Sequence, residues 1–153
     1  MNEKKKKEVF IDGPVPVEKI AAGITSHASM TQIGAHSIFL GQVRADSIDN
    51  KEVIAIEYSC YREMAEEVLF SIREETFSKF ELSCMHIYHS LGRVNAGEIS
   101  LFVFTSSRHR RMAIDACSFV VEEIKAKVPV WGKEILNDQS HIWKTNSLPP
   151  EKI

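Results

Sequence analysis

The alternation of apolar and polar positions along the chain predicts short strands interrupted by amphipathic helices. In the first half, strands are expected at 9–12, from 35 to about 43 and at 51–58, where branched and aromatic residues dominate. Gly41 marks a bulge or a close backbone approach in the second of these strands. The polar stretch 45–51 predicts a flexible loop. Segment 17–28 has helical spacing, with one face formed by Val17, Ile20, Ala21 and Ile24.

The second half carries two longer helical patterns and another pair of strands. Segment 62–80 is one of the helices, and its predicted apolar face consists of Met64, Val68, Ile72, Phe77 and Phe80. Strands are expected at 83–89 and 99–105, joined by a connection rich in turn-forming residues, and a last short strand is expected at 141–144. Strand pairs separated by single helices favour an α+β fold with a mainly antiparallel sheet over a doubly wound one.

The longest helical pattern lies within residues 106–134 and carries positive charge at both ends. Ser106 or Ser107 is the predicted N-cap, and Pro129 ends the helix because the residue before a proline is pushed out of the helical conformation. The first turns hold three basic residues, His109, Arg110 and Arg111. The helix dipole disfavours cations there, so the placement suggests that an anion binds at the start of the helix.

Length and charge indicate one ordinary globular domain. We expect a disordered N-terminus at 1–8, a single domain at 9–146 and a loose tail at 147–153. The formal net charge of −2 gives no overall attraction to nucleic acid, so a nucleic-acid partner is not expected. No run approaches the roughly 18 apolar residues of a membrane span, and the lysines at 4–7 are not followed by the apolar core of a signal peptide. A cytoplasmic protein without a membrane partner is expected.

The cysteines argue against a disulfide framework. There are three of them, an odd number, and none forms a CxxC pair. Cys117 falls within the apolar stripe of the long helix, which favours an inert core thiol over a nucleophile. Cys84 and His86 share one face of a strand while His89 lies on the other, and no third metal ligand is evident. We therefore predict no metal and no cofactor.

Lys125 lies at the edge of the apolar stripe of the long helix, away from its acidic face. A lysine at such a boundary can lose hydration, which lowers its pKa and makes it usable as an acid, base, nucleophile or fixed cation. The alternative is that it simply extends its charge to solvent along the apolar surface. Arg110 and Lys125 are 15 positions apart, about 22 Å along a straight helix, so both reach one small anion only if a two-fold dimer brings opposite helix ends together.

Four motifs in order give the chain a family resemblance: IFLGQVR, HSLGRVNAGE, SSRHRRMAIDA and EEIKAKVPVWGKE. Together they resemble the large, catalytic subunit of molybdopterin synthase over about residues 34–143. The resemblance implies an α/β hammerhead-type fold and a homodimer within a heterotetramer. The other two chains would be small ubiquitin-like sulfur carriers whose C-terminal Gly-Gly ends as a thiocarboxylate. The implied reaction transfers sulfur to cyclic pyranopterin monophosphate and forms the molybdopterin dithiolene.

The resemblance also assigns roles to individual residues. The family's strand-end arginine falls on Arg44, its His-Arg pair on His109 and Arg110, and its helix-end lysine on Lys125. Phe39 matches an aromatic position before the arginine. The family commonly has a second lysine directly after the tryptophan, where this chain has Gly132. Lys133, one place later, is therefore the candidate for that second catalytic cation.

Three functions follow for testing. The first is a sulfurtransferase in which Arg44, His109 and Arg110 bind the phosphate and Lys125 stabilises the oxyanion or holds the carrier's carbonyl. The second is a non-catalytic homologue that keeps the anion and carrier sites but has lost turnover, which the glycine at 132 favours. The third is a cysteine-dependent enzyme, which the predicted burial of Cys117 disfavours.

Overall fold

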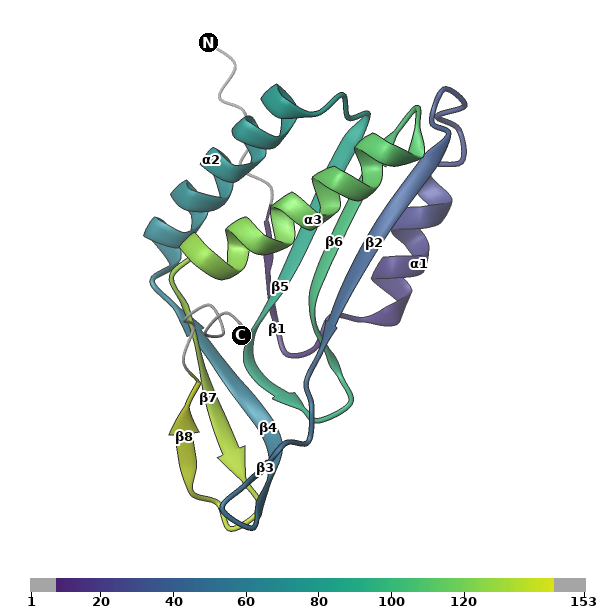
Figure 1. The fold of residues 1–153 in the computed structure, drawn as a ribbon. Helices are drawn as coiled ribbons and strands as arrows, with labels where there is room; N and C mark the ends of the chain where they lie inside the picture. Colours follow the sequence, from purple (N-terminus) through teal and green to yellow (C-terminus); the bar gives the residue numbers. More distant parts are fainter. Residues whose placement is uncertain (1–7, 145–153) are drawn as a thin grey trace, which may run out of the picture.

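The structure is a computed structural model that describes residues 8–144. The N-terminus predicted to be disordered, 1–8, lies outside the described residues except for Glu8, and the predicted loose tail at 147–153 lies outside them entirely. The chain forms three helices and eight strands within that range (Figure 1). The helices are α1 (Val17–Ser26), α2 (Arg62–Lys79) and α3 (Arg110–Lys127). The strands are β1 (Phe10–Asp12), β2 (Ala35–Gln42), β3 (Ser47–Ile48), β4 (Lys51–Cys60), β5 (Cys84–Asn95), β6 (Ile99–Ser107), β7 (Val130–Leu136) and β8 (His141–Trp143).

The sheet is open and mainly antiparallel, as the sequence predicts. Its strand order is β2-β6-β5-β4-β7-β8, while β3 pairs with β4 and the short β1 pairs parallel to β5. The long strand β5 pairs with β6 over its first half and with β4 near its end. This divided pairing lets β4, β7 and β8 diverge from the rest of the sheet as a separate arm (Figure 1).

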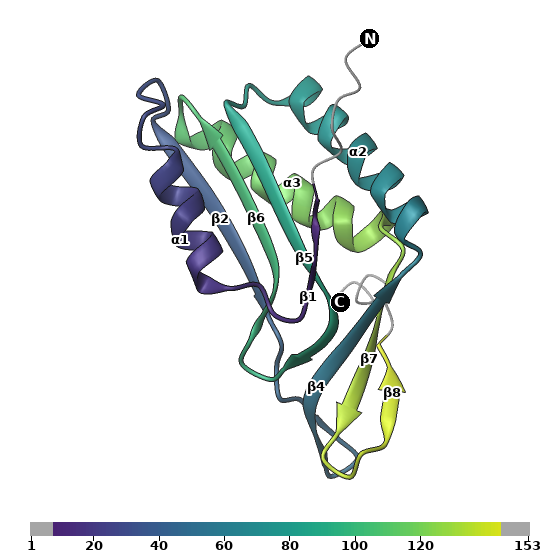
Figure 2. The same ribbon diagram turned by 180° about the vertical axis from the view of Figure 1, so that it is seen from behind.

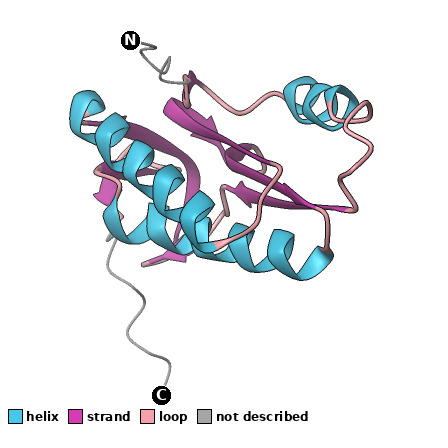
Figure 3. Ribbon diagram, turned by 90° about the horizontal axis from the view of Figure 1, so that it is seen from above, coloured by secondary structure: helices cyan, strands magenta, loops and turns pink. Residues whose placement is uncertain are grey.

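The helices lie on both faces of the larger part of the sheet. Helices α2 and α3 cover one face, and α1 covers the other at β2 and β6 (Figures 2 and 3). The main core lies under α2 and α3, and its fully buried members include Ala65, Ile72, Val103 and Val120. A smaller core under α1 consists of Val15, Ile20, Phe102 and Phe104. Among the described residues, no helix is long and apolar enough to cross a bilayer.

Helix α3 differs from the prediction at its start. It begins at Arg110 with His109 as the N-cap, not with Ser106 or Ser107, because both serines belong to β6 and are buried. The Ser107 hydroxyl donates to the carbonyl of Glu81 at 2.7 Å, so it has no access to the helix. The helix ends at Lys127, before Pro129, as predicted. The residues after the proline form β7, which the sequence pattern did not predict.

Two further expectations are corrected. The polar stretch 45–51 is not simply a loop, because β3 pairs there with the start of β4. In α2 the buried face is displaced from the predicted one: the buried residues are Ala65, Leu69, Ile72 and Thr76, and Met64 is half exposed. Ile72 belongs to both the predicted and the observed face, whereas the predicted members Met64 and Phe77 are exposed.

Candidate functional site

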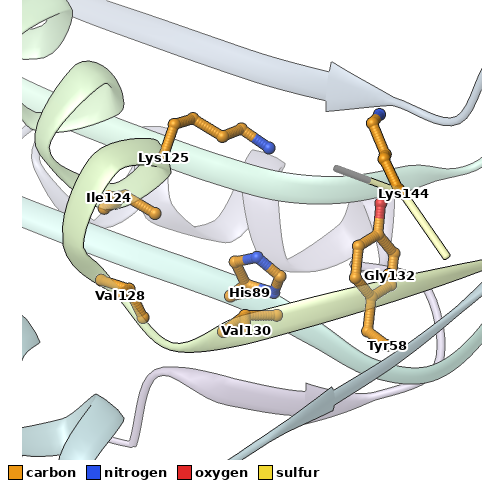
Figure 4. A pocket seen from close by; sticks show the side chains of 8 residues that line it. All are labelled: Tyr58, His89, Ile124, Lys125, Val128, Val130, Gly132 and Lys144. Atoms are coloured by element: carbon orange, nitrogen blue, oxygen red, sulfur yellow. The ribbon is translucent and has the colours of Figure 1, made fainter. Parts of the chain in front are cut away.

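A small pocket lies where the C-terminal end of α3 meets the diverging arm of the sheet (Figure 4). Its volume is about 30 Å³. Since one water needs roughly 10–15 Å³ of such space, the pocket holds about two water-sized groups. Residues from α3, the following turn and strands β4, β5 and β7 line it, together with the residue after β8: Tyr58, His89, Ile124, Lys125, Val128, Val130, Gly132 and Lys144.

Lys125 extends from the last turn of α3 into this pocket (Figure 4). The residue keeps contact with water, yet the surrounding protein partly desolvates its ammonium group. This desolvation lowers the pKa of Lys125, and the positive charge of Lys144 lowers it further. Of the two alternatives that the sequence left open for Lys125, the lowered pKa agrees with partial loss of hydration at an apolar boundary. A lysine in this state gives up a proton more readily than one in water and acts as a cation poorly shielded by solvent.

His89 forms the floor of the pocket and is only 5% exposed. Burial lowers the pKa of His89 to about 4, with a smaller contribution from the charge of Lys125. Its Nδ1–H donates to the carbonyl of Ser90 at 2.8 Å. The neutral ring consequently carries its proton on Nδ1, and Nε2 is left as an acceptor. The pocket thus combines one neutral imidazole with two lysines.

Gly132 lies beside Lys144, the second lysine of the pocket. A Cβ at Gly132 would lie 3.1 Å from Cγ2 of Ile56 and 3.8 Å from Cβ of Lys144. The backbone N–H of Lys144 donates to the carbonyl of Gly132 at 2.8 Å, which places Lys144 beside the glycine on the pocket side. Lys144 therefore supplies a cation near the position at which the family commonly has a lysine.

Lys133, the residue predicted from sequence for this role, does not line the pocket. Successive residues of a strand point to opposite faces, so the side chain of Lys133 leaves the face that Gly132 presents to the pocket. Its Nζ lies 3.9 Å from Oε1 of Glu57 and 6.0 Å from the ring centroid of Trp143. Sequence reasoning missed Lys144 because β7 and its hairpin with β8 were not predicted as a pair. The turn-forming run NDQS at 137–140 was the available signal.

The predicted anion-binding residues lie elsewhere in the chain. His109 and Arg110 are exposed at the start of α3, so the helix separates them from Lys125 as the sequence predicts. Arg44 is exposed after β2, and its Nη2 lies 3.3 Å from Oδ2 of Asp46. Phe39 is half-buried against the main core. One copy of the chain therefore does not gather these residues around Lys125.

The first turn of α3 fits the expectation of an anion site in one respect. Its N-cap makes no side-chain hydrogen bond, and the turn contains no acidic residue. Free N–H groups and two arginines therefore face solvent together at this end of the helix. Cys117, by contrast, is buried in the main core, and burial raises the pKa of its thiol, so its prediction as a core residue is confirmed.

The chain matches the model of one protein family, described as MoaE protein, over residues 12–127. A curated relative from Oryza sativa subsp. indica, named molybdopterin synthase catalytic subunit, is 38% identical over 125 residues. That alignment covers 82% of this chain and 64% of the relative, so the chain spans somewhat less than two thirds of that relative's length.

Solved structures agree with the fold. Molybdopterin synthase from Staphylococcus aureus superposes with a TM-score of 0.77 at 28% identity, covering 94% of this chain and 99% of that one. A chain from the complex of subunits 1 and 2 of molybdopterin-converting factor from Helicobacter pylori 26695 superposes with a TM-score of 0.75 at 19% identity. That superposition covers 92% of each chain. The divided sheet with its diverging arm is thus the hammerhead-type arrangement that the sequence resemblance implied.

Proposed function

Because this chain belongs to the MoaE protein family, we propose that it is the catalytic subunit of a molybdopterin synthase. It would transfer sulfur from a thiocarboxylated small carrier protein to cyclic pyranopterin monophosphate and so form the molybdopterin dithiolene. The observation that carries this proposal is the partly desolvated Lys125 at the end of α3, in a pocket with a second lysine and a neutral histidine.

The size of the pocket suits the reacting end of the carrier rather than the whole pterin. Room for about two water-sized groups matches the two heteroatoms of a thiocarboxylate. The ammonium of Lys125 would pair with this anion and stabilise the oxyanion that forms when sulfur is transferred. Because the ammonium of Lys125 is partly desolvated, it would bind an anion more strongly than the same charge in open solvent.

We propose Lys144 as the second cation of this site. It lines the pocket with Lys125 and lowers the pKa of Lys125 through its charge. Lys133 is the candidate for the second cation that the sequence suggested. It pairs with Glu57 outside the pocket, so its substitution serves as a control for that of Lys144. Both are lysines of the β7–β8 hairpin region, but Lys144 lines the pocket and Lys133 does not.

The pterin phosphate would bind between two copies of the chain. Arg44, His109 and Arg110 supply guanidinium and imidazole groups suited to a phosphate, but they lie away from Lys125 within one copy. A two-fold dimer would place the start of one α3 near the end of the other. Phe39 lies on β2, the strand that leads to Arg44. The assembly would be a homodimer carrying two copies of the sulfur carrier.

The partner is proposed to be a small ubiquitin-like protein with a C-terminal Gly-Gly thiocarboxylate. The Helicobacter pylori relative is described as a complex of two different subunits, which supports a two-protein assembly. A cytoplasmic location fits the three free cysteines, since thiols stay reduced in that compartment.

One observation favours a second function. Gly132 replaces the lysine that the family commonly has after the tryptophan, which is the change expected of a homologue that binds the carrier without turnover. Lys144 supports the catalytic alternative, because it returns a positive charge to the same pocket.

Reconstitution separates these possibilities. Purified chain mixed with thiocarboxylated carrier and cyclic pyranopterin monophosphate is expected to form molybdopterin. Lys125→Ala is expected to lower the rate by about a hundredfold or more, as the loss of an oxyanion-stabilising group does. Lys144→Ala should lower it by about tenfold or more, whereas Lys133→Ala should stay within about twofold, because a half-exposed ion pair contributes little.

Each outcome decides one assignment. No product from the intact chain, with carrier binding retained, would support the non-catalytic homologue. Full activity in Lys125→Ala would remove Lys125 from the mechanism. A large loss in Lys133→Ala with little change in Lys144→Ala would return the second cation to Lys133.

A further inference from the structure

A second and larger cavity lies beneath α1, on the face of the sheet opposite α2 and α3. Its volume is about 290 Å³. Lys19, His27, His86, Tyr88 and Phe104 are among the residues that line it. None of these residues belongs to the pocket around Lys125, so the two sites are separate.

Three potential metal ligands meet at the edge of this cavity. His27 is the C-cap residue of α1 and is only 8% exposed, while Cys84 and His86 are half-buried on β5. Because Cys84 and His86 are two positions apart on a strand, their side chains share one face. One ligand atom from each of the three residues lies within 4.8 Å of the others. The helix thus supplies the third ligand that the sequence pattern alone did not show.

The distances approach those of a tetrahedral zinc site. The Nε2 atoms of His27 and His86 lie 3.1 Å apart. Two nitrogens bound to Zn²⁺ at about 2.0–2.1 Å are about 3.3 Å apart in a tetrahedron, so the spacing of the histidine nitrogens already fits, and the rings need only turn so that both nitrogens point at the ion. The Cys84 sulfur needs a shift of about 1 Å, which a side-chain rotation on a strand can provide.

The orientation of His27 also fits a ligand. Its Nδ1–H donates to the carbonyl of Gly23 at 2.6 Å, which fixes the ring and leaves Nε2 without a proton. A backbone carbonyl holding the second ring nitrogen is the usual outer support of a metal-bound histidine. The buried ring of Phe104 packs against both imidazoles, with centroid distances of 5.0 Å to His27 and 5.9 Å to His86. The Phe104 ring therefore limits the rotation of both imidazoles.

We propose that His27, Cys84 and His86 bind one zinc-class divalent cation that fastens α1 to β5. On binding, the Cys84 thiol releases its proton to solvent and the proton of His86 moves to its Nδ1, so both Nε2 atoms and the sulfur coordinate the metal. The fourth position is open toward the cavity and takes water or a small anionic ligand.

The weak packing of α1 gives such a metal a structural role. Ile20 is the buried residue of this helix, whereas Val17 is 67% exposed and Ile24 is 45% exposed. The predicted apolar face of α1 is therefore largely in solvent, and few contacts hold the helix on the sheet. A metal shared by the end of α1 and by β5 would stabilise the folded state by its binding free energy.

Cobalt substitution tests the site directly. Untagged, metal-free protein is titrated with Co²⁺ alone, and we expect one equivalent to give the visible absorption of tetrahedral Co²⁺ together with a near-ultraviolet thiolate-to-cobalt band. Zn²⁺ is expected to displace the cobalt and to raise the melting temperature of the protein. Cys84→Ser should abolish the thiolate band, and His27→Gln should weaken binding by at least about tenfold.

The controls separate this cluster from other ligands in the chain. Cys60→Ser and His141→Gln carry the same chemical changes outside the cluster and should keep wild-type affinity. Absence of a thiolate band at one equivalent, or a band that survives Cys84→Ser, would overturn the proposal. If His27→Gln does not fold, the near-isosteric Cys84→Ser still decides the outcome. Molybdopterin formation is not a readout here, so the result is independent of the proposed function.

Discussion

At the scale of single residues, the pocket at the end of α3 sets two lysines above a histidine that burial keeps neutral. The environment, rather than the residue type, decides the charge of each group. His89 loses most of its hydration because β1 and β4 close around it, and the rings of Phe10 and Tyr58 pack against its imidazole. Lys125 keeps contact with solvent, and partial desolvation together with the charge of Lys144 lowers its pKa. The ammonium of Lys125 is suited to bind an anionic group, and the neutral imidazole of His89 is suited to accept a proton from it.

The neutral state of His89 gives the fold a specific pH dependence. The pKa is about 4 in the folded chain and about 6.5 in the unfolded chain, so the unfolded state binds more protons between these values. Stability should therefore rise with pH from about 4 to about 6.5 and then level off. The contribution of His89 over this range is about 3 kcal/mol.

Urea denaturation at pH 4.5 and at pH 7 measures this effect. His89→Gln is expected to be less stable at pH 7 but to lose less stability on acidification than the wild type. His141→Gln, which changes an exposed histidine, should keep the wild-type difference between the two pH values. Equal differences in all three proteins would mean that His89 is protonated in the folded chain.

At the scale of elements, the sequence predicted what depends on local pattern and missed what depends on pairing. Strands β1, β2, β4, β5, β6 and β8 and all three helices were predicted from the local pattern of residues. Strand β7 was missed because it follows directly on a strong helical pattern, and only its pairing with β4 and β8 makes it extended. The same omission hid Lys144, which reaches the pocket through the β7–β8 hairpin. Lys125 could be predicted because its position on α3 is fixed by helical spacing.

The start of α3 is held by a close approach between two loops. Gly34, just before β2, donates its N–H to the carbonyl of Ser107 at 3.0 Å. A Cβ at this glycine would collide with the carbonyl oxygen of Arg108, a rigid backbone atom. Gly34→Ala is therefore expected to destabilise the protein by about 1–3 kcal/mol, because the loop before α3 must move.

Gly23→Ala is the matched control for this prediction. Gly23 lies inside α1, and a Cβ there meets nothing within 4 Å. Alanine is the better helix former, so this change should stabilise the protein by about 0.4–1 kcal/mol. Denaturation curves of the two variants measure both effects. Equal stability of Gly34→Ala and the wild type would show that the junction at the start of α3 is loose.

At the scale of the whole molecule, α3 separates two groups of cations. Its first turn carries exposed cations and free N–H groups, and its last turn carries Lys125 beside the pocket. A straight helix separates these ends by about 22 Å from Arg110 to Lys125, which exceeds the reach of one small substrate. Under the proposed function, two copies of α3 lie antiparallel in a two-fold dimer. Each Lys125 then lies near the Arg110 of the other copy, which gives two equivalent composite sites.

Mixed dimers test this arrangement. Arg110→Ala and Lys125→Ala each damage one end of α3, so each homodimer is expected to be nearly inactive. When the two variants are co-expressed and form mixed dimers, one of the two composite sites contains both intact residues. Random pairing gives about half mixed dimers, so about a quarter of the wild-type rate of molybdopterin formation should return.

The combination of Lys125→Ala with Lys144→Ala is the control, because both residues line the same pocket of one copy and no mixed dimer contains an intact pocket. Recovery with the first pair and none with the control would require a site shared between copies, whereas no recovery with either pair would confine the site to one copy.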